Sequence, residues 1–365
     1  MNFDFSEDQR SLQGELRNFL TDTSPLSVNR KALEAQAGID KALWRQMGEL
    51  GWLGIRIPER FGGSGLGMLD LALAAEEVGR ALSPIPFGSS ICGAAETIIV
   101  EGTEEQQAKW LPGVATGEQI GVLALADGAG PGGEAKVRTS FGPEGVKGRK
   151  VGVADGEAAT FAIVAAHSGD HTALVLVDLD QPGVKRIAQR SLDPSRSAVI
   201  IEFDGADGEL LGGPGAMDAM FLRSATYCAF EQLGGADAIF KITREFMDFR
   251  EAFGKPISSY QALKHRMADM YTALELARSN SYYAAWALSV GSKELAEAAS
   301  CARISASQAF QLTSTESIQM HGGIGFTWES DCHLFYRRAK WLSAWLGSPD
   351  NWRERLVNEL NALVA

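Results

Sequence analysis

The sequence predicts an α+β multidomain protein with three parts. These are an N-terminal helical domain (1–119), a small middle β-barrel or β-sandwich domain (120–213) and a C-terminal four-helix bundle (214–365). Glycine marks the division, with 15 in 1–119, 17 in 120–215 and eight in 216–365. All eight tryptophans lie outside 120–215. Apolar residues also change from helical spacing to alternation and back near these boundaries, and 365 residues are enough for two or three domains.

The N-terminal part is expected to be mostly helical. Apolar residues recur every three or four positions over 3–20, 39–50 and 69–82. Ser6 is a plausible N-cap of the first helix. Thr103 begins another helix, and Gln106 stands at the third position of a capping box.

The middle part is expected to consist of short strands. Five β-type runs, at 120–126, 146–153, 161–166, 173–178 and 198–203, are separated by Gly, Asp and Pro clusters. No long amphipathic segment interrupts them, which disfavours βαβ units and a Rossmann sheet.

Long helices return in the C-terminal part. The stretch 217–253 has no proline and is predicted to be one helix that ends at Gly254, with Pro256 just beyond. Ser258 is the predicted N-cap of the next helix, with Gln261 as its capping-box partner. Further helices are expected over 292–321 and 332–345, and the pair Ser348-Pro349 begins a last one. Helices of this length joined by tight turns favour an antiparallel bundle.

Charge and composition narrow the function. The net charge of −12 disfavours nucleic-acid binding, which needs clustered Lys and Arg. The longest uncharged stretch, 81–95, is too short and contains too many prolines to span a bilayer, and the acidic residues 1–10 do not resemble a secretory signal. The four cysteines and five histidines show no metal-binding spacing. We therefore expect a cytoplasmic protein without a metal site or a membrane partner.

Two segments of the predicted bundle are candidates for cofactor binding. The segment 250–257 (REAFGKPI), followed by Gln261, places Arg250 at a helix end, where its guanidinium fork can match a phosphate. The segment 319–329 (QMHGGIGFTWE) has three glycines in four positions, which allow a ligand to approach the backbone closely. Taken alone, each segment is also consistent with an ordinary helix end and turn. No strand precedes the glycines, so this is not a dinucleotide-binding fingerprint.

Together these segments resemble the acyl-CoA dehydrogenase family, which carries R-x-x-F-G-x-P-I…Q and Q-x-x-G-G-x-G-F/Y segments. The resemblance extends over the whole chain. Residues 50–63 are similar to the family's L-G-W…P-E…G-G segment, and 102–117 to its G-T…Q…L-P…G stretch. Residues 192–204 resemble the end of the family's β domain, and the family's three-part fold agrees with the one predicted above.

The resemblance implies an FAD-dependent desaturation of an acyl-CoA thioester between its α and β carbons, with electrons passed to an electron-transfer flavoprotein. A carboxylate would remove the α proton, and the thioester carbonyl must be polarised to make that proton acidic. In this family the bundle segments contact the FAD of a neighbouring subunit, so a homo- or hetero-oligomer is implied. The residues carried over as FAD contacts are Arg250, Phe253, Gln261, Gln319, Gly322 and Gly323.

The sequence departs from the family in its β domain. The family's T-E-P-x-A-G-S-D type segment corresponds to 124–131 (ALADGAGP), which lacks the threonine and glutamate. The family's W-I-T-N segment corresponds to 151–155 (VGVAD), which lacks the tryptophan. Flavin contacts from this chain's own β domain are therefore fewer than the family pattern provides.

Neither of the two positions at which the family places its catalytic base holds an acid. One corresponds to Leu346, and the other, 26 residues before Arg250, is Ser224. Glu231, two turns after Ser224 on the same helix face, is the catalytic candidate, because burial would raise the pKa of its carboxyl. Its alternative role is a structural carboxylate paired with an Arg or Lys across the bundle.

Two further residues are weaker candidates. Glu329, after the glycines, is expected to cap a helix rather than act as a base. Arg223 is a substrate-binding candidate, although the family's arginine lies two positions later.

Three functions are compatible with these residues. The first is an acyl-CoA dehydrogenase. The second is a non-catalytic partner subunit of a heterotetramer, as occurs in bacterial dehydrogenases for sterol side-chain thioesters, in which the other subunit supplies the base. The third is a related flavoenzyme, such as an oxidase.

Overall fold

The computed structural model describes residues 5–128 and 137–364. The chain forms two compact units, of which unit 1 comprises Met1–Arg30, Ala72–Ser83 and Ala225–Ala365, and unit 2 comprises Lys31–Leu71 and Pro84–Ser224. The division into 1–119, 120–213 and 214–365 stays a prediction. Within the described residues, no helix is both long and apolar enough to cross a membrane.

The N-terminal region is helical, as predicted. Its helices are α1 (Glu7–Thr23), α2 (Leu26–Ala35), α3 (Lys41–Glu49), α4 (Met68–Arg80), α5 (Glu96–Glu101) and α6 (Glu104–Thr116), with short 3₁₀ turns at Trp52–Gly54 and Glu59–Phe61. Both predicted caps are confirmed, because Ser6 and Thr103 each form a capping box with the glutamine three residues on. A π-helix at Phe87–Ala95 was not predicted. All nine of its residues are buried, so it has no amphipathic period to detect.

The middle region is one eight-stranded mixed sheet. The strands are β1 (Gly121–Ala124), β2 (Ser140–Gly142), β3 (Gly145–Ala154), β4 (Phe161–Ser168), β5 (His171–Asp178), β6 (Val184–Gln189), β7 (Ala198–Ala206) and β8 (Glu209–Leu211). Their order is β6-β7-β3-β2-β4-β5-β8, and β1 pairs in parallel with β4. The five predicted runs are strands, whereas β2, β6 and β8 were not predicted, because they are short or largely solvent-facing. The apolar faces of β3, β4, β5 and β7 form the core of this sheet.

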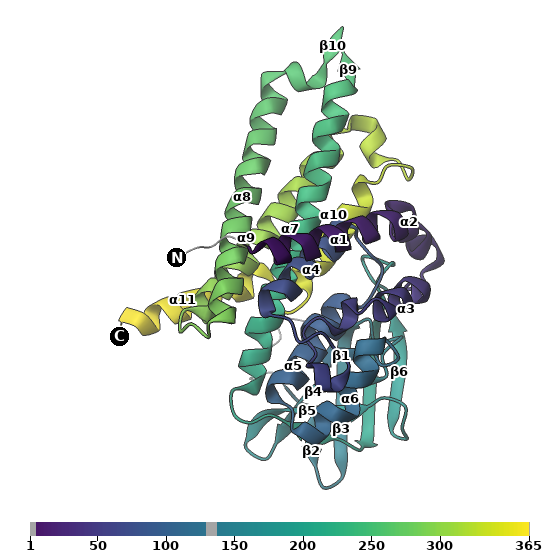
Figure 1. The fold of residues 1–365 in the computed structure, drawn as a ribbon, viewed down its shortest axis with the longest axis vertical. Coiled ribbons are helices and arrows are strands. Elements are labelled where there is room, and N and C mark those ends of the chain that lie inside the picture. Colours follow the sequence, from purple (N-terminus) through teal and green to yellow (C-terminus); the bar gives the residue numbers. More distant parts are fainter. Residues whose placement is uncertain (1–4, 129–136, 365) are drawn as a thin grey trace. The chain divides into compact units, whose positions relative to one another are not determined.

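The C-terminal region consists of long helices joined by short connections (Figure 1). In order they are α7 (Ala216–Phe249), the strands β9 (Glu251–Ala252) and β10 (Lys255–Pro256), α8 (Gln261–Ser289), α9 (Leu295–Met320), α10 (Cys332–Ala344) and α11 (Pro349–Val364). Figure 1 shows α7, α8 and α9 running alongside one another, with β9 and β10 at one end of the α7–α8 pair. The predicted cap at Ser348 is confirmed, because its hydroxyl accepts the Asn351 amide at 3.4 Å.

Two predictions about the connection between α7 and α8 were wrong. The helix predicted over 217–253, which is α7, ends at Phe249 rather than Phe253, because the following residues turn back as a hairpin. Ser258 is not an N-cap: it lies in a 3₁₀ turn, and Tyr260 precedes α8 without a side-chain capping bond. The capping-box pattern gave the wrong start because the 3₁₀ turn moves the N-cap of α8 by two residues, from Ser258 to Tyr260.

Within unit 1, helices α4 and α7 cross so closely that their backbones are in contact. A Cβ at Gly234 would lie 1.8 Å from the carbonyl oxygen of Glu76, and one at Gly79 would lie 2.0 Å from that of Glu231. Only glycine allows two helices to approach so closely. Beside the crossing, the guanidinium of Arg80 on α4 forms ion pairs with Glu76 and with Asp237 of α7.

Candidate functional site

The hairpin between α7 and α8 presents the first predicted cofactor segment. Ala252 pairs with Lys255, and both central residues are left-handed, Phe253 with φ +52° and Gly254 with φ +79°. This is the geometry of a tight hairpin of type I′, which glycine and asparagine favour. The amide of Ile257 donates to the carbonyl of Arg250 at 2.8 Å and closes the base of the hairpin.

Phe253 is an unusual residue for the tip of such a turn. A bulky side chain with positive φ is strained, and this ring is 97% exposed, so burial in its own chain does not offset the strain. Backbone strain of this kind concentrates at binding sites. The ring at the tip is therefore accessible from outside this chain.

The two polar candidates of this segment are also exposed. Arg250 follows the last residue of α7, where the helix dipole favours a cation, and within the described residues it has no ion-pair partner. Gln261 is the first residue of α8 and has no side-chain hydrogen bond to the described part of its own chain. Both side chains are available to a ligand or to another subunit.

The second predicted segment connects α9 to a 3₁₀ helix, Gly322–Phe326. Gly322 has a positive φ of +61°, and a Cβ at Gly325 would lie 2.3 Å from the carbonyl oxygen of Ile318. Gly323 has neither restriction, because its φ is not positive and a Cβ added there would meet no atom of the described chain within 4 Å. Nothing in the described chain requires glycine at 323, and Gln319 is exposed just before it.

A stack of aromatic rings brings the two segments together in unit 1. The ring of Phe246 lies 4.0 Å from the imidazole of His321, with an angle of 22° between the planes. Phe246 also contacts Phe249, edge to face, at 5.4 Å. All six sequence-predicted cofactor contacts thus belong to segments at one end of α7 and α9.

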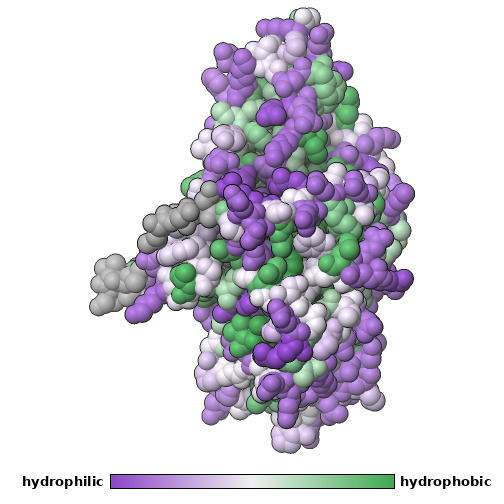
Figure 2. Space-filling model, viewed as in Figure 1, coloured by the Kyte–Doolittle hydropathy of each residue, from purple (hydrophilic) through white to green (hydrophobic). Residues whose placement is uncertain are grey.

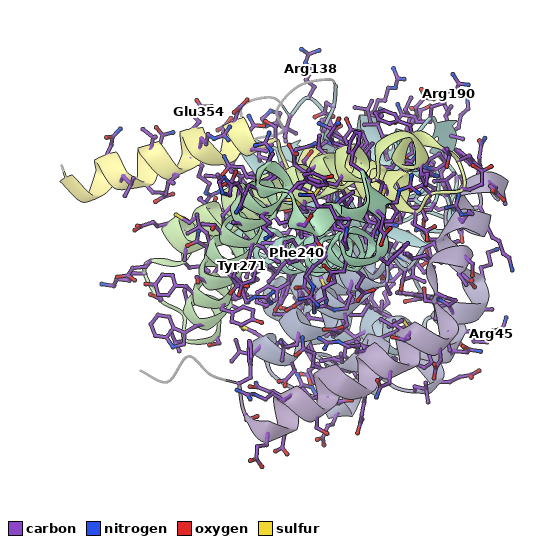
Figure 3. All side chains as sticks on the ribbon, turned by 90° about the horizontal axis from the view of Figure 1, so that it is seen from above. Arg45, Arg138, Arg190, Phe240, Tyr271 and Glu354 are labelled. Atoms are coloured by element: carbon purple, nitrogen blue, oxygen red, sulfur yellow. The ribbon has the colours of Figure 1, made fainter. Side chains whose placement is uncertain are left out.

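Apolar side chains are exposed at the end of α7, in the hairpin and in the glycine-rich segment. They are Phe249, Phe253, Ile324, Phe326 and Trp328. Figure 2 shows apolar surface among polar surface over the upper part of the molecule, where Figure 1 places the β9–β10 hairpin. Farther along the same helices, Phe240 of α7 and Tyr271 of α8 have ring centroids 5.9 Å apart (Figure 3). Exposed apolar residues in such numbers are a common feature of interaction surfaces.

Glu231, the predicted base, is buried in unit 1 and faces Arg338. Its carboxylate oxygen lies 3.6 Å from a guanidinium nitrogen of Arg338, and both side chains are at most 3% exposed. The same guanidinium donates to the carbonyl of Leu82 at 3.4 Å. This is the arrangement expected of the alternative role, a carboxylate paired across the bundle.

A second buried guanidinium, that of Arg303 on α9, lies in the same interior. It donates to Gln232 at 2.6 Å, to Ser307 at 2.7 Å and to the backbone carbonyls of Leu342 and Trp345. Burial lowers the pKa of Arg303, and the charges of Cys228 and Glu231 oppose that effect. Arg303 thereby fixes the end of α10.

We expect Glu231→Gln to lower the stability of the chain by about 2 kcal/mol, because Arg338 would lose the charge that compensates it in the interior. Urea unfolding of the isolated chain measures this change. Glu202→Gln is a matched control, since that carboxylate is 41% exposed and makes only 3.9 Å contacts with cations. Equal stability of Glu231→Gln and wild type would contradict the structural role.

The other sequence candidates are Arg223, Ser224 and Glu329. Arg223 of α7 has a buried Nε without a hydrogen-bond partner in the described chain, and its Nη1 lies 3.9 Å from the sulfur of Met68. The hydroxyl of Ser224 is likewise buried, and no partner for it lies among the described residues. Glu329 is exposed, and its backbone carbonyl accepts from Arg30 at 3.2 Å.

Leu346, which corresponds to one family base position, is a buried leucine with φ +59° in the connection between α10 and α11. Its carbonyl accepts the indole N–H of Trp352 at 3.0 Å. An apolar side chain at this position cannot remove a proton.

In the sheet, the stretch that departs from the family is held by internal contacts. Asp127 accepts the ammonium of Lys150 at 3.0 Å and the hydroxyl of Thr139. Lys150 also donates to the carbonyl of Leu125 at 3.2 Å, and burial lowers its pKa although Asp127 opposes that effect. Residues 129–131 of the predicted flavin-side stretch lie outside the described residues.

Sequence reasoning did not identify the contribution of Phe246 and Phe249. Both look like ordinary apolar positions of a long helix. The one sequence signal is that the two phenylalanines are three residues apart, so that they share a helix face just before Arg250.

Comparison with known proteins identifies the family of the chain. Residues 6–118 match the family description "Acyl-CoA dehydrogenase, N-terminal domain", and residues 212–360 match "Acyl-CoA dehydrogenase, C-terminal domain". The chain is 31% identical to "Acyl-CoA dehydrogenase IpdE2" of Mycobacterium tuberculosis, over 97% of this chain and 98% of that protein. The chain belongs to the acyl-CoA dehydrogenase family.

Solved structures of the family have the same fold. The "Tcur3481-Tcur3483 steroid ACAD" has a TM-score of 0.91 at 29% identity and covers 98% of this chain and 99% of its own. The "ChsE4-ChsE5 complex" of Mycobacterium tuberculosis has a TM-score of 0.91 at 26% identity and covers 99% of both chains. The predicted arrangement of helical, β and helical regions is thus confirmed for this acyl-CoA dehydrogenase family member.

Proposed function

We propose that the chain is a subunit of an FAD-dependent acyl-CoA dehydrogenase that desaturates an acyl-CoA thioester between its α and β carbons. In this proposal it is the partner subunit, which completes a flavin site held mainly by its neighbour and does not supply the base. The observation that carries the proposal is the hairpin tip, where Phe253 is strained and 97% exposed. We propose that this ring is received by another chain, because no contact within the described residues offsets its strain.

The residues present fit a cofactor with a pyrophosphate that is approached from outside the chain. Arg250 is exposed and has no ion-pair partner in the described chain, and a guanidinium pairs two phosphate oxygens at once. Gln261 and Gln319 add exposed amides, and Gly323 leaves space beside its backbone. A bound FAD would supply the hydride acceptor for the β carbon of the substrate.

The position of the carboxylates supports the partner role. The two family base positions hold Ser224 and Leu346, and Glu231 is paired with Arg338 in the interior. The Glu231 carboxylate is thus already engaged with a cation of its own chain, 3.6 Å away. We therefore place the base in the neighbouring subunit. Arg223, whose Nε has no partner among the described residues, is the substrate-side candidate of this chain and would bind an anionic group.

The names of similar proteins suggest the class of substrate and the partners. Two of the similar structures are named for pairs of proteins, and one of these names contains "steroid ACAD". Another, at 26% identity, is named for an electron-transferring flavoprotein. We propose a hetero-oligomer that acts on bulky acyl groups, such as sterol side chains, and passes its electrons to an electron-transfer flavoprotein.

The alternative is a self-sufficient dehydrogenase in which Glu231 is the base. It is favoured by the placement of Ser224, Cys228 and Glu231 on one face of α7, where they form a polar stripe in an apolar helix. In that case Glu231→Gln would abolish flavin reduction by substrate. In our proposal it leaves the reduction rate unchanged within twofold at a temperature where the variant is folded.

Purification decides between the two functions. The chain is expressed alone and together with a second acyl-CoA dehydrogenase family subunit from the same organism, and the visible spectrum and the mass of each product are recorded. We expect a colourless product from the single chain and a yellow complex from the pair. A yellow homo-oligomer of this chain that acyl-CoA bleaches would overturn the partner role.

A further inference from the structure

The stack between Phe246 and His321 is the direct side-chain contact that joins the hairpin end of α7 to the glycine-rich turn. The two rings belong to different helices and lie almost parallel, 4.0 Å apart. Arg250 is tied to the same residue, because its amide donates to the carbonyl of Phe246 at 2.9 Å. On the other side, His321 directly precedes Gly322 and Gly323.

The imidazole is oriented as well as stacked. Its Nδ1 lies 2.7 Å from the carbonyl of Ser317, one turn earlier on α9. The tautomer that fits this contact carries a proton on Nδ1 and donates to the carbonyl. The hydroxyl of Ser317 in turn accepts a hydrogen bond from Thr243 of α7 at 2.6 Å. This bond joins α7 and α9 a second time, about one helical turn before the stacked rings.

We infer that His321 is a positioning residue that sets the spacing between Arg250 and the glycine turn, and that its protonation loosens this spacing and weakens the contact with the flavin-bearing neighbour. This inference rests on the proposed function. His321 touches neither substrate nor the reacting atoms in it, and acts through the two segments that it joins.

The electrostatic surroundings give the direction of the pH effect. Burial lowers the pKa of His321, and the Ser317 carbonyl opposes that shift. In the part of the chain that the structure describes, no charged side chain shifts this pKa appreciably. The charged residues of the packed elements within four positions of the two rings are Arg244, Glu245, Asp248 and Arg250 on α7. Glu316, five positions before His321 on α9, pairs with Arg266 at 3.1 Å.

A histidine whose pKa is lowered by folding binds fewer protons in the folded state than in the unfolded state. Its contribution to stability is therefore complete above the unfolded pKa of about 6.5 and is lost as the pH falls from there through the folded pKa. The stack is intact at neutral pH and loosens in mild acid.

The test measures the affinity of this chain for its flavin-bearing neighbour at pH 7.5 and at pH 5.5, by titration and by the flavin fluorescence of the complex. Wild type should lose at least fivefold in affinity between the two values. His321→Phe keeps a stacking ring but cannot be protonated, so its affinity should stay within twofold. His321→Ala removes the ring, so this variant should bind the neighbour weakly at both pH values.

A second half-buried histidine provides the matched control. His333 stacks on Trp328 at 4.8 Å, and burial also lowers its pKa. His333→Phe should keep the full pH dependence of wild type, because this stack lies beyond the glycine turn. The imidazole resonances of His321, titrated by NMR in the isolated chain, should give a midpoint below that of an unfolded peptide.

The outcomes separate this inference from the function on which it rests. If wild type forms no flavin-containing complex at pH 7.5, the proposed function fails. If the complex forms but His321→Phe shows the same pH profile as wild type, or His321→Ala binds as tightly as wild type at pH 7.5, the role of His321 is overturned.

Discussion

Replacing Gly234 by alanine is expected to unfold a large fraction of the chain at physiological temperature. The added methyl group would lie 1.8 Å from the carbonyl oxygen of Glu76, a backbone atom that cannot move without displacing α4. Overpacking of this kind costs about 3 kcal/mol or more, which is a large share of the stability of a typical domain. Thermal unfolding followed by circular dichroism measures the loss.

Gly14→Ala is the matched control, because Gly14 also lies inside a helix of unit 1 and a Cβ there meets no atom within 4 Å. It should stabilise the chain by about 0.5–1 kcal/mol, since alanine favours the helix more than glycine does. Equal unfolding temperatures for Gly234→Ala and wild type would show that the crossing of α4 and α7 is not as close as described.

Replacing Phe253 by glycine is expected to change stability and assembly in opposite directions. Glycine adopts the positive φ of this position without strain, so the isolated chain should gain up to about 1 kcal/mol in stability. The complex with the flavin-bearing neighbour should weaken at least tenfold, because the exposed ring is the part that the neighbour receives. Urea unfolding gives the first quantity, and titration with the neighbour gives the second.

Arg250→Ala should likewise weaken binding at least tenfold, but with unchanged stability, because the exposed guanidinium has no intrachain ion pair in the described residues. Lys264→Ala, which removes an exposed cation from the first turn of α8, is its control and should bind as wild type. If Phe253→Gly and Arg250→Ala both bind normally, the hairpin is not part of the interface.

The sequence predicts much of this fold because the residues that begin and end helices act locally. Capping residues such as Ser6 and Thr103 act within one helical turn, so their pattern alone locates a helix start. The same kind of pattern failed at Ser258, because the chain first completes a hairpin whose positive φ at Phe253 could not be expected for an aromatic residue. The π-helix was missed because complete burial removes any polar face.

The candidate site was predictable only in part, for a related reason. Its two segments were visible as motifs, but nothing in either one shows that Phe246 and His321 bring them together across 75 residues. Glu231 and Arg338 illustrate the same limit. A buried glutamate on a helix face is compatible with catalysis until its partner, 107 residues later, is located.

The guanidinium of Arg303 has a consequence for the order in which the chain folds. It holds the end of α10 through carbonyls that lie 39 and 42 residues farther along the sequence. These loops are shorter than the 75 residues that separate Gln232 of α7 from Ser307 of α9, so closing them costs less chain entropy. The end of α10 is therefore expected to dock on α9 before α7 completes the cluster around the guanidinium.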